Sequence, residues 1–129
     1  MEPDVGYSSV SGSKPSKVTA IATLTLISGI VNIIWSGILT ILVVIGSFGI
    51  GILCIPVTAL PSVLGIFEVI YATRLMANPP RPHKNAQVLA ILEICGVLYG
   101  NILSLVAGIL ALVYNNDPEV QNYFASLSQ

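Results

Sequence analysis

The stretch "VTAIATLTLISGIVNIIWSGILTILVVI", from Val18 to Ile45, decides the fold of this chain because it contains no charged residue. The charge-free run continues to Phe67, and a second one extends from Ile94 to Tyr114. Uncharged apolar runs longer than ~18 residues are typical of membrane-spanning helices. The chain has 129 residues, 54% of them hydrophobic, and a mean hydropathy of +0.88, which is more apolar surface than a soluble domain of this size can bury. The sequence therefore predicts an all-α integral membrane protein.

The number of crossings follows from the lengths of these runs. About 20 helical residues cross the ~30 Å hydrocarbon core. The block from Val18 to Met76 has room for two crossings, and three glycines and a proline in Gly46 to Pro56 mark the break between them. We therefore expect three transmembrane helices, at about 18–45, 55–76 and 86–114.

The basic residues predict the orientation. With three crossings, all five lie on one side of the membrane, and the positive-inside rule makes that side cytoplasmic. They are Lys14, Lys17, Arg74, Arg81 and Lys84. We thus expect a multi-pass protein of the cell membrane with a cytoplasmic N-terminus and an extracytoplasmic C-terminus. Residues 1–17, rich in Ser, Gly and Pro, are expected to be a disordered cytoplasmic tail.

Residues 115–129 are expected to form a short amphipathic helix in the outer interface. Asp117 is a good N-cap, and Pro118 suits the first helical position. One apolar face follows at helical spacing, formed by Val120, Tyr123, Phe124 and Leu127. This face would lie in the membrane interface or dock on a neighbouring protein, and the sequence does not separate the two.

Each expected span carries one face of small or polar residues, which we expect to contact protein while the Ile/Leu/Val side contacts lipid. In the third span this face comprises Glu93, Gly96, Gly100, Ser104 and Gly108, with Asn101 at its edge. In the second it comprises Thr58, Pro61, Gly65, Glu68 and Ala72. In the first it comprises Thr25, Ser28, Gly29, Asn32 and Ser36. Gly96 and Gly100 form a GxxxG pair, which favours close helix packing.

Glu68 and Glu93 interrupt apolar stretches at a similar depth, ~10 Å inside the cytoplasmic end. An isolated ionised carboxylate in the bilayer is costly, by at least ~2.5 kcal/mol at its centre. The two acids are therefore protonated, bound to a cation or a partner's basic group, or hydrogen-bonded to a neighbouring side chain. The candidate neighbours are Asn32, Ser36, Tyr71 and Tyr99. A structural role as interhelical hydrogen-bonding groups and a functional role as a proton- or cation-binding pair both stay open.

The segment "NDPEV", Asn116 to Val120, followed by Tyr123 and Phe124, resembles the end of the last span in small uncharacterised bacterial polytopic membrane proteins. Leu92 to Ile94 and Gly100 to Val113 agree with this resemblance, which covers about the last forty residues. It implies a bacterial inner-membrane setting and transfers no functional residue.

Three functions are compatible with these patterns. The first is a non-enzymatic accessory or structural subunit that packs through its small-residue faces into an oligomer or a larger complex. The second is a proton- or cation-conducting protein that uses Glu68 and Glu93. An enzyme acting on lipid is the third and is not expected, because no nucleophile, metal cluster or nucleotide-binding motif is recognisable. The net charge of -1 gives no reason to expect nucleic acid. Membrane lipids and other transmembrane helices are the expected partners, and cofactors stay unknown.

Overall fold

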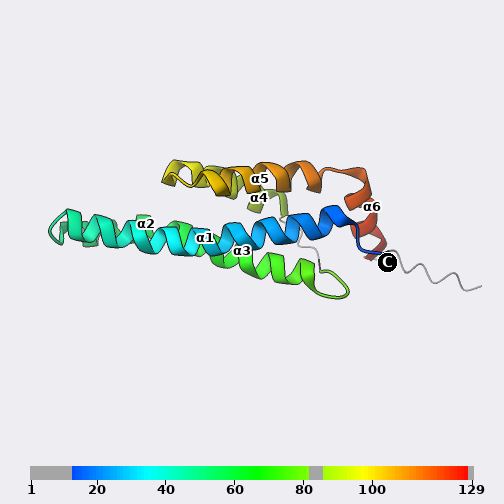
Figure 1. Cartoon of the computed structure of the whole chain (residues 1–129), viewed down its shortest axis with the longest axis horizontal. Coiled ribbons are helices and arrows are strands. Elements are labelled where there is room, and N and C mark those ends of the chain that lie inside the picture. Colours follow the sequence, from blue (N-terminus) through cyan, green and yellow to red (C-terminus); the bar gives the residue numbers. More distant parts are fainter. Residues whose placement is uncertain (1–12, 82–85, 128–129) are drawn as a thin grey trace, which may run out of the picture.

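The computed structural model describes residues 13–81 and 86–127, and the regular elements within them are helices (Figure 1). The chain begins with α1, Ser16–Gly46, a helix of 31 residues. At ~1.5 Å per residue it is about 46 Å long, which exceeds the ~30 Å core of a bilayer. Most of the expected tail 1–17 lies outside the described residues, but Ser16 and Lys17 already belong to α1.

The chain reverses inside the predicted break. The left-handed conformation of Phe48 (φ 52°) and Gly49 (φ 92°) ends α1, and glycine adopts such a φ without strain. The second arm of the hairpin consists of three successive helices: η1 (Ile50–Cys54), α2 (Ile55–Thr58) and α3 (Leu60–Met76). Two segments, Ser16–Gly46 and Ile50–Met76, are long and apolar enough to cross a membrane by length and composition.

Two glycines bring α1 and α3 into direct backbone contact. A Cβ atom at Gly65 would lie 2.5 Å from the carbonyl oxygen of Gly29, and a Cβ at Gly29 would lie 2.8 Å from the carbonyl oxygen of Gly65. Any larger side chain at either position would force the helices apart. The pair thus fixes both the spacing of the hairpin and the register in which the neighbouring polar residues meet.

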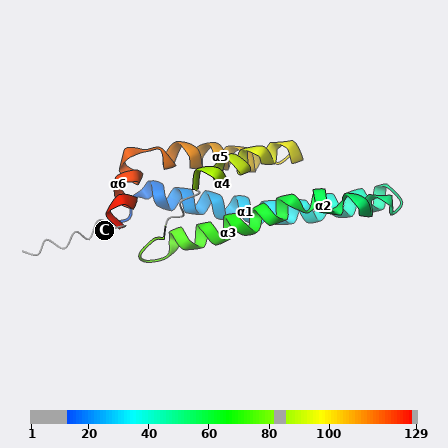
Figure 2. The same cartoon turned by 180° about the vertical axis from the view of Figure 1, so that it is seen from behind.

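The expected third span, 86–114, is not a single helix. The structure has α4 (Ala86–Cys95), η2 (Gly96–Tyr99) and α5 (Ile102–Asn115), with a reversal at Gly100, whose φ is 77°. α5 runs back alongside α4, so the two form a short hairpin against part of α1 (Figures 1 and 2). With ~21 Å of helix in α5, the hairpin reaches only partway along α1. The expectation was wrong because hydropathy does not distinguish one crossing from two apolar half-length helices.

The reversal also changes the place of the C-terminal helix. α6 (Pro118–Leu127) lies beside the start of α1, at the end of the molecule opposite the α1–η1 reversal (Figure 1). The helix begins as predicted, with Pro118 in its first turn and Asp117 accepting a 3.0 Å hydrogen bond from the amide of Glu119. The start of α1 and α6 therefore meet at one end of the bundle, whereas the sequence placed the two termini on opposite sides of a membrane.

The apolar face of α6 packs on the chain itself. Val120 is fully buried in a cluster with Val18, Ile21 and Leu75, while Tyr123 and Phe124 pack partly against that cluster. Leu127, the last member of the predicted face, is 37% exposed. This face therefore closes the end of the bundle, an arrangement that neither of the two sequence alternatives described.

Polar residues occupy the interior and apolar residues the exterior along much of the chain. The predicted face of α1 is buried throughout: Thr25, Ser28, Gly29, Asn32 and Ser36. Large side chains on its other side are exposed, including Ile34 at 57% and Leu42 at 62%. The small-residue faces thus contact other helices of the same chain.

Candidate functional site

The candidate site is a hydrogen-bonded network inside the bundle, centred on Asn32. The Gly29–Gly65 contact lies one helical turn away, so Asn32 of α1 faces Glu68 of α3. The amide nitrogen of Asn32 donates to both carboxylate oxygens of Glu68, at 2.9 and 3.1 Å. Both side chains are at most 1% exposed. A hydrogen bond between neutral groups contributes about 0.5–1.5 kcal/mol net, so this pair helps to hold α1 on α3.

The α4–α5 hairpin joins the same network. The amide nitrogen of Asn101 donates to the side-chain oxygen of Asn32 at 2.5 Å. The side-chain oxygen of Asn101 accepts from the backbone amide of Ser104 at 3.2 Å, which caps the start of α5. The Ser104 hydroxyl donates to the carbonyl oxygen of Glu93 at 2.9 Å. Asn101 thus caps the start of α5, links that helix to α1 and helps to close the short hairpin.

Glu93 of α4 is buried at 1% exposure, yet neither of its carboxylate oxygens has a hydrogen-bond partner among the described residues. Gly108 of α5 makes room for it, because a Cβ there would lie 2.8 Å from the Cβ of Glu93. The carboxyl group is close enough to Glu68 and to Tyr71 for electrostatic interaction, and the Tyr71 hydroxyl is likewise buried without a partner. An ionised carboxylate that is buried without a hydrogen-bond partner is unfavourable. A bound proton or a bound cation would remove this cost at Glu93.

The predicted small-residue face of the third span is divided by the reversal. Gly96 lies in η2 against Ser104, since a Cβ on it would lie 2.8 Å from the Ser104 hydroxyl oxygen. Gly100 is exposed and supplies the left-handed φ of the turn. The expected GxxxG helix interface was therefore wrong: the two glycines form a 3-10 turn and a chain reversal. Gly108 and Ser104 do lie in a helix contact, between α5 and α4.

Trp35 holds the end of the short hairpin. Its indole nitrogen donates to the carbonyl oxygen of Tyr99 at 2.7 Å. One residue further along α1, the Ser36 hydroxyl donates to the carbonyl oxygen of Thr58 at 2.6 Å. Both contacts satisfy carbonyl groups next to helix breaks, where the regular i to i−4 pattern fails. Sequence reasoning gave no role to the backbone of Tyr99 and Thr58, because their partners are distant in the chain.

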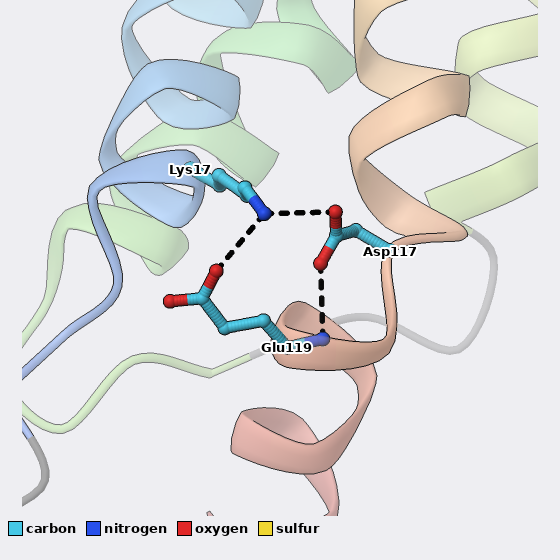
Figure 3. Close-up of polar contacts among 3 residues, drawn as sticks. All are labelled: Lys17, Asp117 and Glu119. Atoms are coloured by element: carbon cyan, nitrogen blue, oxygen red, sulfur yellow. Dashed lines mark hydrogen bonds and ion pairs between the residues drawn. The ribbon is translucent and has the colours of Figure 1, made fainter.

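A separate charged cluster joins the start of α6 to the start of α1 (Figure 3). The ammonium group of Lys17 lies 2.8 Å from a carboxylate oxygen of Asp117 and 3.0 Å from one of Glu119. The hydrogen bond from Lys17 lowers the pKa of Asp117 below its usual value. Sequence reasoning missed this cluster, because it placed Lys17 and Asp117 on opposite sides of the membrane.

Comparisons of the chain with protein-family models, curated proteins and solved structures find no match. The resemblance to small bacterial membrane proteins therefore stays a prediction.

No group of three or more His, Cys, Asp or Glu side chains comes together in residues 13–81 and 86–127. Cys54 and Cys95 are both free and exposed. Within the described bundle, the candidate functional side chains are thus the two buried acids and the amides and hydroxyls around them.

Proposed function

We propose that this chain is a non-enzymatic integral membrane protein that serves as an accessory or structural subunit of an oligomer or a larger membrane complex. One observation carries the membrane proposal, namely the reversed distribution of polarity in α1. Asn32 and Ser36 are buried at 1% and 2% exposure, whereas Ile41 and Ile45 are 59% and 72% exposed. In water such a surface would associate nonspecifically, but in lipid it needs no cover.

The proposed topology differs from the three-span arrangement. Ser16–Gly46 and Ile50–Met76 would cross the membrane, and α4 and α5 would form a re-entrant hairpin that enters and leaves on the same side. Non-helical backbone inside a membrane is tolerated where it is packed against protein. The bonds of Asn101 to Asn32 and of Tyr99 to Trp35 meet that condition. Because Lys17, Arg74 and α6 lie at one end, the positive-inside rule would place both ends of the described chain in the cytoplasm.

Cysteine labelling tests this topology. The substitutions Ser126→Cys and Ser47→Cys are each made in a background with Cys54→Ala and Cys95→Ala, and vesicles of both orientations are treated with a membrane-impermeant maleimide. Ser126→Cys and the control Ser13→Cys are both expected to react in inside-out vesicles. Ser47→Cys is expected to react only in right-side-out vesicles. Reaction of Ser126→Cys and Ser13→Cys from opposite faces would refute it.

The subunit role is supported by the small amount of protein outside the apolar helices. In the described chain this is α6 and the short segments around it, which leaves little surface for an independent soluble activity. The small-residue faces are used inside the chain, so a partner would contact the outward Ile and Leu side chains instead. Extraction of native membranes in a gentle detergent tests the role. Co-migration with a large complex is expected, and migration of the chain alone at every detergent concentration would contradict it.

A second candidate function is proton or cation binding by Glu68 and Glu93. The specific observation in its favour is the unpartnered carboxyl group of buried Glu93 next to Glu68. The test compares ion flux into liposomes that contain the wild type, Glu93→Gln or the control Glu119→Gln, which changes an exposed acid. Flux that disappears only with Glu93→Gln supports this function, and equal flux in all three and in empty liposomes excludes it.

A further inference from the structure

A half-open groove runs along the outside of the bundle between α3 and α4. It consists of two adjoining cavities of about 410 Å³ each. Both are lined by Leu64 and Phe67 of α3 and by Leu92 of α4, so the groove is continuous. Each cavity has the size of a typical small-ligand pocket, ~300–1,000 Å³.

The groove has an apolar body and one charged end. At the reversal of the short hairpin it is lined by Leu60, Leu98 and Tyr99, and at the opposite end by Val88 and Arg74. Arg74 lies in the last turn of α3, at the same end of the bundle as Lys17 and α6. Among the described residues, no acidic side chain pairs with its guanidinium group, since the two ion pairs there both belong to Lys17.

We propose that this groove binds a phospholipid, with an acyl chain between α3 and α4 and the headgroup phosphate on Arg74. The inference rests on the proposed membrane insertion. From Leu60 to Arg74, α3 spans ~20 Å, which is enough for an acyl chain that extends ~15 Å to the middle of the bilayer. Guanidinium binds phosphate through two parallel hydrogen bonds, so a phosphate satisfies the one charge that the apolar lining leaves unpaired.

A transmembrane helix of another protein fits the groove less well. Its apolar side chains would cover Leu64 and Leu92 but would leave the Arg74 guanidinium without an anion. A lipid without a phosphate, such as diacylglycerol, would fill the apolar body and lack the same contact. The charge at the end of the groove therefore favours the phospholipid.

Lipid retention after purification tests the proposal. The full chain is reconstituted in vesicles of phosphatidylglycerol or of diacylglycerol mixed with a neutral carrier lipid, extracted in mild detergent and examined by native mass spectrometry. Arg74→Gln is expected to lower the retained phosphatidylglycerol about tenfold, because a hydrogen bond to a charged group corresponds to roughly that factor. Arg81→Gln, which removes the same charge from an exposed residue outside the groove, is expected to retain it.

A second pair of variants tests the body of the groove without touching charge. Leu92→Trp would fill it, whereas Ile66→Trp places the same side chain at an exposed position of α3 outside the lining. Loss of phosphatidylglycerol in Leu92→Trp alone supports the proposal. The proposal is overturned if Arg74→Gln and Arg81→Gln retain equal amounts of phosphatidylglycerol. It is also overturned if Leu92→Trp releases a bound polypeptide and no lipid. If the chain does not fractionate with membranes at all, the membrane proposal itself is refuted. This result differs from a membrane-bound chain that retains no phosphatidylglycerol.

Discussion

The backbone contact between Gly29 and Gly65 gives a quantitative prediction about the hairpin of α1 and α3. In Gly65→Ala the new methyl group would lie 2.5 Å from the carbonyl oxygen of Gly29 and 2.9 Å from a side-chain carbon of Ile33. Both distances are well below the 3.4 Å at which ordinary contacts begin. The carbonyl belongs to helix backbone, so the strain can be relieved only if the two helices move apart.

The expected cost of Gly65→Ala is about 1–3 kcal/mol, the usual range for overpacking a tight interface. The hydrogen bonds from Asn32 to Glu68 lie one turn away and would lengthen as the helices separate. Alanine favours a helix over glycine by up to ~1 kcal/mol, which offsets only part of this cost. The matched control is Gly37→Ala in α1, where a Cβ meets nothing within 4 Å. This control is expected to be neutral or slightly stabilising.

The assay is reversible unfolding in mixed micelles with increasing dodecyl sulfate, followed by far-ultraviolet circular dichroism and by the fluorescence of Trp35. Trp35 reports on the tertiary structure because its indole is hydrogen-bonded to the short hairpin. Gly65→Ala should lower the free energy of unfolding relative to both the wild type and Gly37→Ala. If the two variants have equal stability, the backbone contact between Gly29 and Gly65 does not hold the hairpin together.

Three further predictions concern the polar network and the charged cluster. Asn101→Ala removes the cap of α5 and the bond to Asn32, so amide exchange in α4 and α5 should accelerate, whereas the exposed control Asn122→Ala should leave it unchanged. Glu68→Met should destabilise the fold by about 1–3 kcal/mol, because the Asn32 amide loses both Glu68 oxygens and keeps only its 3.4 Å bond to the Ser104 hydroxyl. Glu93→Met should be neutral or stabilising, because the Glu93 carboxyl group has no hydrogen-bond partner among the described residues. The opposite order of stability in chemical denaturation would contradict the assigned bonds. The lowered pKa of Asp117 means that its contribution is present above its unfolded pKa, near 3.8, and is lost as pH falls through the lower folded value. The NMR amide signals of α6 should therefore shift toward those of Lys17→Gln on acidification, and no change would argue against the Lys17 contact.

The buried acids show how far sequence reasoning reaches into the site. Helical periodicity placed Asn32 and Glu68 on facing stripes, and the structure joins them by hydrogen bonds. It also placed Glu93 and Ser104 on one face, but for the wrong reason, because the face was drawn on a continuous helix. The signal for the reversal was present in the dipeptide Gly100–Asn101, a typical turn and N-cap combination. It was outweighed by the apolar residues on both sides.

The sequence by itself determined where the first two long apolar helices lie, where the hairpin between them turns and which of their faces are polar. These features follow from local composition and from the 3.6-residue period, so they need no knowledge of a partner. Only the tertiary structure decided that 86–115 doubles back and that α6 returns to Lys17. Apolar helices of half and full length have the same hydropathy, and the choice between them depends on contacts such as that from Asn101 to Asn32, 69 residues apart in the chain.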